Sequence, residues 1–493
     1  FVVDTRLLVP YQTSLPICPT GTKVSFSHHF SCEPTSTVGI VIRQLAVLVG
    51  CHIMVVNGDD ARALSPEEVD SMLAEDIHRM PFDERCRIEN EIHCVQSLAP
   101  VETPAMVEEN LASMQQEIDL LPEKHAYDLA VFDGSDYVFD RDFRIKMLRA
   151  DLWNPQKAAL RFTRHLMYLS RYFGPPALKR PLLHDDLCQE SKEFLRRGNY
   201  QILPSRDRAG RLILCHQGHT ATSSPRVNIQ VVLYLWTVLS EDIETQKHGF
   251  TIIFSAGESL LQDREHLSEI MAAANEGIPL RTSAVHMALP NTPVFTLLRT
   301  CLSIQARFLE SIRIRSYPHD LSSIETQYQL LTFGIPVQEL PVTSTGKIKT
   351  KNHLQWIQAR QAIEKIRAFS SGSIRAQSIT LHARVKDVLF RRGGNTKHYG
   401  NMDFLYLLEN HRDAFFNPVS NHTTKKAVIQ SIIEQITSQG GRFLTLDTKM
   451  NWWTEITDVD NLEDRITSSF YYHLTRRRKA MAQSCKGRRQ AKL

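Results

Sequence analysis

The sequence predicts an α/β body, made of a helical preface and a mixed sheet covered by helices, followed by a separate small α+β domain. Two observations predict the body: helical patterns dominate residues 61–198, and from residue 199 short β-branched and aromatic runs alternate with helical patterns. A third predicts the second domain. Residues 386–493 contain 18 Lys and Arg against 11 Asp and Glu, a net charge of +7 that leaves −3 for the rest of a chain whose total is +4.

The length and the cysteine content limit the classes of protein to which the chain can belong. A chain of 493 residues is long enough for two or three domains, at about 100–200 residues each. The nine cysteines show no paired spacing, which argues against a disulfide framework and favours an intracellular protein, cytoplasmic or nuclear. The chain has no Cys-x-x-Cys or His-Glu-x-x-His spacing, so a zinc site would need ligands from distant segments, and we expect no metal.

One segment approaches the length and apolarity of a membrane span. Residues 38–56 (VGIVIRQLAVLVGCHIMVV) are mostly apolar, but Arg43 and Gln44 lie inside the run. A charged side chain in the middle of a bilayer is costly, so we interpret the run as a buried strand pair or helix. We therefore expect no transmembrane span, and leave peripheral contact with a membrane open.

Composition and periodicity divide the chain into six segments. The boundary between the body and the second domain is placed at a Ser- and Gly-rich stretch, residues 370–373, which is typical of a linker. The segments are an unassigned region (1–60), a helical preface (61–198), an α/β domain (199–368), a linker (369–385), a small basic α+β domain (386–480) and a basic tail (481–493).

Capping residues and apolar periodicity predict the elements of the body. A capping box at residues 65–68 and the Asn154-Pro155 pair each mark a helix start. The run at 250–254 is apolar and β-branched throughout, as in a strand buried on both faces. In all, we expect helices at 80–95, 107–121, 154–172, 190–197, 227–239, 294–309, 324–331 and 353–369, and strands at 200–203, 211–215, 250–254, 283–288 and 311–317.

Residues 80–365 resemble the CRAL-TRIO family of hydrophobic-ligand and phosphoinositide transfer domains, in a form found in diatoms. Residues 147–150 (MLRA) followed by 154–159 (NPQKAA) match the family's helical preface. Asp207, Gly210 and Arg211 match its first hairpin, and 250–254 takes the place of its central strand. The resemblance also places the helix that gates the ligand cavity at residues 294–309, and the strand after it at 311–317.

The resemblance implies a pocket for a hydrophobic ligand or phospholipid, since an apolar helix lying across a sheet leaves a cavity. The alternative is that each predicted lining residue is an ordinary residue of the hydrophobic core and lines no pocket. Arginines at 299, 307, 313 and 315 could meet an anionic head group, whereas ion pairs or solvation are the commoner role for arginine. The predicted lining residues are Leu233, Leu235, Trp236, Ile252, Phe254, Leu297, Leu298, Leu302, Phe308 and Leu309.

Residues 386–480 resemble a second family, a domain of unknown function that recurs in diatom proteins. The matching motifs are residues 391–395 (RRGGN), 398–401 (HYGN), 440–444 (GGRFL) and 452–456 (WWTEI). The family usually has Gly where this chain has Arg391. The resemblance implies no activity.

Periodicity predicts two core helices in this domain, around 404–408 and 427–436, and a hairpin of strands 442–446 and 451–457. Asn461 is the expected cap of a last helix. Helices with a two-stranded wing are reminiscent of winged-helix DNA readers, by analogy of fold alone.

Basic residues in the domain could contact phosphate, because backbone N–H groups of a Gly-Gly turn and nearby cations suit an anion. A tight turn with solvated arginines is the plain alternative. The predicted contacts to phosphate or nucleic acid are Arg391, Arg392, Gly393, Gly394, Lys397, Arg442, Arg476, Arg477, Arg478 and Lys479.

Function is predicted from these features because the chain carries no catalytic signature: it has no GxGxxG, GxSxG or Walker sequence. We expect a non-enzymatic binding protein with a lipid pocket in the body, no cofactor other than a bound lipid, and a basic module that contacts nucleic acid or another acidic partner through residues 386–493. The alternative is a scaffold or regulatory protein whose pocket is filled and which acts only through protein or DNA contacts.

Overall fold

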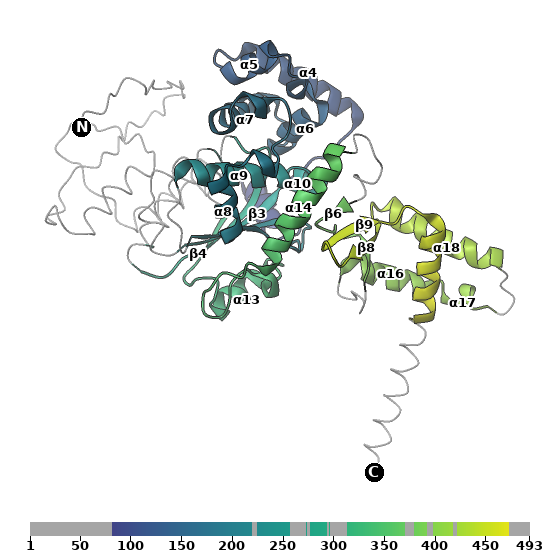
Figure 1. The fold of residues 1–493 in the computed structure, drawn as a ribbon. Helices are drawn as coiled ribbons and strands as arrows, with labels where there is room; N and C mark the ends of the chain where they lie inside the picture. Colours follow the sequence, from purple (N-terminus) through teal and green to yellow (C-terminus); the bar gives the residue numbers. More distant parts are fainter. Residues whose placement is uncertain are drawn as a thin grey trace, which may run out of the picture.

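The computed structural model describes residues 81–218, 224–256, 273, 277–292, 295, 313–369, 379–391, 398–417 and 422–472. They contain one five-stranded and one four-stranded sheet, and helices make up more of the chain than strands do (Figure 1). The predicted mixed α/β architecture with a separate C-terminal region is confirmed. The helix expected at 65, the apolar run 38–56 and the basic tail lie outside the described residues, and so does the helix expected at 294–309 except for residue 295.

A layer of helices precedes the larger sheet, as predicted. Thr103 and Asn154 cap two of these helices by accepting hydrogen bonds from the N–H groups of Met106 and Lys157. A proline follows each cap, at a position where the missing N–H costs nothing. The helices are α3 (Phe82–Ile92), α4 (Pro104–Leu120), α5 (His125–Phe132), α6 (Arg141–Ala150), α7 (Pro155–Phe173) and α8 (Gln189–Arg197), with short 3-10 turns at Tyr137–Phe139, Pro175–Leu178 and His184–Asp186.

The larger sheet is mixed and its strands lie in chain order. The first two strands form the predicted antiparallel hairpin, and each later strand adds in parallel to the one before it. The helices α9 (Pro225–Leu239) and α10 (Ile243–His248) connect the second and third strands, as a parallel crossover requires. The strands are β1 (Tyr200–Ile202), β2 (Ile213–Gly218), β3 (Phe250–Ala256), β4 (Thr282–Ala288) and β5 (Ile314–Tyr317).

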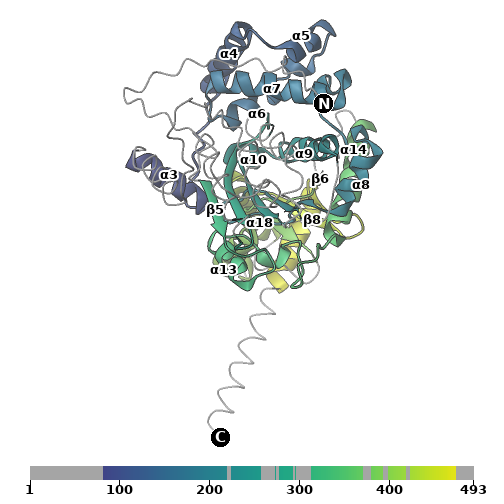
Figure 2. The ribbon, with the colours of Figure 1, turned by 90° about the vertical axis from the view of Figure 1, so that its left-hand side faces the viewer.

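Each face of this sheet packs against a different set of helices. One face joins α9 and the preface helices in the largest apolar cluster of the described chain. The other face is covered by α3, by α13 (Ile324–Thr332) and by the turn after it, which includes the 3-10 turn Val337–Glu339. Figures 1 and 2 show α9 and α13 on opposite sides of the sheet.

The C-terminal module contains a four-stranded sheet, so the predicted two-stranded wing is wrong. The hairpin itself is confirmed as β8 (Phe443–Asp447) and β9 (Trp452–Glu455), but β7 (Val388–Phe390) pairs in parallel with β8, and β6 (Ile379–Thr380) pairs with β9. Strands of two and three residues are too short to show alternation, which is why the sequence did not reveal them.

Helices complete the core of the module. Phe404, Leu408, Ile432 and Ile436 are buried together with β7 and β8, as the periodicity predicted. The last described helix begins at residue 459 rather than at a cap on Asn461. The helices are α16 (Tyr399–Asn410), α17 (Arg412–Phe415), α18 (His422–Ser438) and residues 459–472.

The module is joined to the body by a long helix and by polar contacts. Helix α14 (Lys351–Phe369) packs Ala359 and Ile363 against Ile379 of β6 and Trp452 of β9. The guanidinium of Arg206 donates to the carbonyl of Ala383 at 2.7 Å, and it also pairs with the body carboxylate of Asp242. Part of the predicted linker therefore lies against the body.

Gly400 should not tolerate a side chain. A Cβ at this position would lie 2.3 Å from the carbonyl oxygen of Asp387, which is backbone and cannot rotate away. We expect Gly400→Ala to lower the free energy of unfolding of the full chain by about 1–3 kcal/mol, measured by urea denaturation. Gly440→Asn is the control, because a Cβ there meets nothing within 4 Å and Asn adopts its positive φ of 82° readily. An equal loss in both variants would contradict this account.

Candidate functional site

The larger sheet carries a row of half-buried apolar side chains on the face that packs against α9. Ile252 of β3 pairs with Val285 of β4, which in turn pairs with Ile314 of β5, so the three lie side by side. Two residues further along β3, Phe254 lies on the same face because side chains alternate along a strand. All four are partly exposed to solvent.

The opposite face of the same strands is closed. Cys215, Ile253 and Ala284 alternate with the half-buried row, and each is 0% exposed. Both faces are apolar, so hydrophobicity alone does not explain the difference. The difference lies in how completely each face is covered.

An aromatic ladder runs across three strands of the half-buried face. The rings of Tyr200 and His216 stack with centroids 4.3 Å apart, and those of His216 and Phe254 are 4.9 Å apart. The ladder fixes the position of Phe254, one of the predicted lining residues, at the carboxyl end of β3.

The structure brings several predicted lining residues together. Leu233, Leu235 and Trp236 of α9 are buried in the same apolar cluster against which Ile252 packs. The indole N–H of Trp236 is buried and has no hydrogen-bond partner among the described residues, a feature that no sequence pattern indicates. The other predicted lining residues, Leu297, Leu298, Leu302, Phe308 and Leu309, lie outside the described residues.

Two of the arginines considered as head-group ligands are in ion pairs. Arg313 donates to the buried carboxylate of Glu91 at 2.6 Å, which Arg281 also reaches at 2.6 Å. Burial raises the pKa of Glu91, but the two arginines outweigh burial and bring its pKa below the ordinary value. Arg315 pairs with Glu89 at 2.6 Å. The paired alternative thus holds for Arg313 and Arg315, while Arg299 and Arg307 lie outside the described residues.

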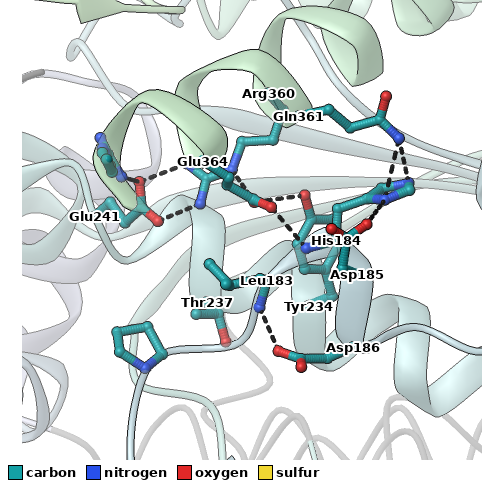
Figure 3. Close-up of polar contacts among 12 residues, drawn as sticks. Leu183, His184, Asp185, Asp186, Tyr234, Thr237, Glu241, Arg360, Gln361 and Glu364 are labelled. Carbon is teal, nitrogen blue, oxygen red and sulfur yellow. Dashed lines mark hydrogen bonds and ion pairs between the residues drawn. The ribbon is translucent and has the colours of Figure 1, made fainter. Parts of the chain in front are cut away.

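A second buried polar cluster holds α14 against α9 (Figure 3). Arg360 of α14 donates to Glu241, which follows α9, at 2.6 Å and to Glu364 at 2.6 Å. Glu364 also accepts hydrogen bonds from the Tyr234 hydroxyl and from the backbone N–H of His184. Burial alone would raise the pKa of Glu241, yet Arg360 and Arg367 lower it to about 2. The charges satisfy one another, which is typical of a structural contact between helices.

In the C-terminal module, five residues of the predicted family motifs and their surroundings pack around β7, and we call them the β7 node: Asp387, Gly400, Asn401, Gly441 and Arg442. The buried carboxylate of Asp387 accepts from the Arg442 guanidinium at 2.7 Å. The Asn401 side chain accepts from the N–H of Leu389 and donates to its carbonyl, as a neighbouring strand would. Gly441, like Gly400, lies so close to the backbone of residue 386 that a Cβ would collide with it. These residue types are therefore explained by packing.

Of the ten predicted phosphate contacts, the structure describes two, Arg391 and Arg442. Arg442 has a structural ion pair with Asp387, which the sequence prediction missed, and Arg391 lies exposed at the end of β7. Residues Arg392, Gly393, Gly394 and Lys397, and the group Arg476, Arg477, Arg478 and Lys479, lie outside the described residues. Phosphate contact by all of them stays a prediction.

The described residues contain neither a membrane-spanning helix nor a cluster of metal ligands. None of the helices there has both the length and the apolarity needed to cross a membrane. The same part of the chain contains no group of three or more His, Cys, Asp or Glu side chains placed to hold a metal ion.

Comparison with known proteins identifies one part of the chain. Residues 387–467 match the model of a domain of unknown function, DUF6824, which agrees with the predicted resemblance of the C-terminal module. No curated protein matches the chain. The module at 387–467 is thus similar to a recurrent domain of unknown function. The CRAL-TRIO family is not among the matched families, so the resemblance of the body to that family stays a prediction.

The ion pairs of Glu241 should make stability depend on pH. Since its pKa is lowered from 4.5 to about 2, the stabilisation is complete above about pH 4.5 and is lost as the pH falls towards 2. We expect Glu241→Gln to reduce this acid-induced loss by about 2–3 kcal/mol and to lower stability at neutral pH, because Arg360 would be left buried without its partner. Thermal denaturation from pH 7 to pH 3 measures both effects.

The matched control is Glu108→Gln. Glu108 also pairs with an arginine, Arg141, but both side chains are more than half exposed. Its replacement should change neither the stability at neutral pH nor the acid slope. If the two variants showed the same acid slope, Glu241 would not be the group responsible.

Proposed function

We propose that the body is a CRAL-TRIO-like domain that binds a hydrophobic ligand, and that the protein is a binding protein rather than an enzyme. The single observation that carries this proposal is the half-buried apolar row of Ile252, Phe254, Val285 and Ile314. An apolar row across a sheet is ordinarily closed by the protein's own core, as it is on the other face.

The geometry suits a lipid chain. Each methylene group that leaves water for such a surface contributes about 0.8 kcal/mol, so a chain of ten carbons would contribute several kcal/mol. The α9 residues Leu233, Leu235 and Trp236 would form the floor beside β3. The segment at 294–309 would form the gate, as the resemblance implies, with Leu302 among its apolar residues.

The unpartnered N–H of Trp236 supports a ligand with a polar atom. Indole N–H groups that are buried ordinarily find an acceptor, since an unpaired donor costs about 1–3 kcal/mol. A carbonyl or hydroxyl oxygen near the apolar part of a lipid would provide it. A phospholipid has such oxygens at the join between its chains and its head group.

A filled pocket is the competing proposal for the body. In that case, the protein would act as a scaffold through protein or DNA contacts. Native mass spectrometry of the purified full chain separates the two proposals. A lipid that co-purifies supports an open pocket. The absence of both a co-purifying lipid and lipid uptake from vesicles would contradict an open pocket.

We further propose that the C-terminal module contacts nucleic acid or another acidic partner. The excess of basic residues in 386–493 supports this, and so do two exposed aromatic rings, Tyr399 and Tyr406, on the helix that follows the Arg-Gly-Gly segment. Exposed aromatic rings beside cations suit single-stranded nucleic acid, whose bases stack on such rings. The DNA-reader analogy based on a two-stranded wing no longer supports the proposal.

Replacing Phe254 should weaken lipid uptake. We expect Phe254→Ala to lower the affinity of the full chain for a fluorescent phosphatidylcholine by about tenfold, because it removes an aromatic contact from the half-buried row. Ile253→Val is the matched control, since Ile253 is the next residue but lies on the closed face. It should cost about 1 kcal/mol of stability and leave lipid affinity unchanged. Equal lipid affinity in wild type and Phe254→Ala would argue against this surface.

Binding of the module to nucleic acid should depend steeply on salt. We expect binding of single-stranded DNA to weaken in a variant of the full chain in which four basic residues are replaced by Gln: Arg476, Arg477, Arg478 and Lys479. The slope of log K against log salt should become smaller by up to about 3. Fluorescence anisotropy at several salt concentrations measures this.

A control with the same number of charges removed comes from the body. Arg87, Arg196, Arg197 and Lys347 are all exposed, and their replacement by Gln should leave the slope unchanged. Wild-type protein that bound no DNA, or bound it without a salt slope, would exclude phosphate recognition as the role of the module.

A further inference from the structure

Three neutral polar side chains lie next to one another at the carboxyl ends of β2 and β3. Gln217 of β2 and Ser255 of β3 are partners in the parallel register, so their side chains lie on the same face. Asn199, which directly precedes β1, is tied to Gln217 by two hydrogen bonds to its backbone, at 2.7 and 2.8 Å. We name these three residues the polar row. Gln217 and Ser255 lie on the closed face, opposite the half-buried apolar row.

The polar row is buried and its polar atoms lack partners. Asn199, Gln217 and Ser255 are 4%, 1% and 1% exposed. Among the residues that the structure describes, no hydrogen bond reaches Asn199 Oδ1, Gln217 Oε1, Gln217 Nε2 or Ser255 Oγ. Burying one such group costs about 1–3 kcal/mol, and folded proteins contain few of them. Three neighbouring residues with this defect indicate that something else supplies the hydrogen bonds.

A neighbouring glutamine shows that this sheet can satisfy a buried amide. Gln201 of β1 is as buried as Asn199, and its Nε2 donates to the carbonyls of Gly198 and Lys349 at 2.9 and 3.0 Å. At the carboxyl ends of β2 and β3, by contrast, Gln217 and Ser255 lack such partners. In open α/β sheets, this edge is where ligands bind.

The charge distribution indicates a neutral ligand. The buried arginines of this face, Arg211, Arg281 and Arg313, precede β2, β4 and β5, so they lie at the amino ends of the strands. They interact there with Asp207 and Glu91. The polar row at the other end has no charge of its own. It offers amide N–H donors, amide oxygen acceptors and one hydroxyl, which is the set that matches the hydroxyl groups of a ligand.

We propose that the polar row binds a neutral small molecule with several hydroxyl groups. Its hydroxyls donate to Asn199 Oδ1 and Gln217 Oε1 and accept from Gln217 Nε2, and the Ser255 hydroxyl does either. This site goes beyond the lipid-binding proposal and does not depend on it, because Gln217 and Ser255 lie on the opposite face of the sheet from Ile252 and Phe254.

Titration of the full chain with myo-inositol and with glycerol, followed by ligand-observed NMR, tests the proposal. We expect saturable binding of at least one of the two. Gln217→Met and Ser255→Ala should each weaken it about tenfold, as expected for the loss of one or two hydrogen bonds. Both variants should fold, and should be at least as resistant to heat as the wild type, because each removes a buried group that lacks a partner.

The matched control is Gln201→Met, which changes a buried glutamine that has partners. It should lower the thermal stability and leave polyol affinity unchanged. If Gln217→Met did not fold, Ser255→Ala, which removes a single oxygen atom, would give the same discrimination. No saturable binding of either polyol would mean that ordered water alone fills the row, and equal affinity in wild type and Ser255→Ala would place the polyol elsewhere. Either result would overturn the proposal.

Discussion

The parallel pairing of β3 with β2 and β4 is the constraint on which the rest of the body depends. It fixes which side chains of the three strands share a face, because a shift by one residue would exchange the two faces completely. On one face, Ile252 and Val285 form part of the half-buried row. On the other, Ile253 and Ala284 are closed under α3 and α13. The proposed lipid surface and the polar row both follow from this one register.

Buried charges then hold the outer helices to the sheet. Glu91 brings α3 to the start of β4 and β5 through two arginines that are far away in the sequence. Arg360 of α14 pairs with Glu241 after α9, and Glu364 of α14 accepts from Tyr234 of α9, so these groups hold α14 against α9. Each of these charges would be costly without its partner, so the pairs fix where the helices lie more than they add stability. For Arg313 and Arg360, the structure therefore provides a role that involves no ligand.

The C-terminal module shows how a motif can be fully explained by packing. Asp387 pairs with Arg442, and the Asn401 side chain satisfies the backbone of Leu389 in β7, while Gly400 and Gly441 allow the backbones to approach. A recurring pattern of Gly, Arg and Asn suggests phosphate binding when it is considered as a sequence. In the structure, Arg442 is tied to Asp387, so a role in binding has to come from residues outside this node, such as Arg391.

The sequence by itself determined those elements that have strong local signals. Short apolar runs predicted the strands β1, β2 and β3, and the Asn154-Pro155 pair predicted the start of α7, because these signals are local and strong. Only the tertiary structure decided what the side chains meet. The short strands β6 and β7, the ion pair of Arg442 and the unpartnered atoms of Gln217 and Ser255 all depend on segments that are distant in the chain. Local periodicity shows that a residue is buried, but whether its polar atoms find partners is set by contacts that form only when the chain has folded.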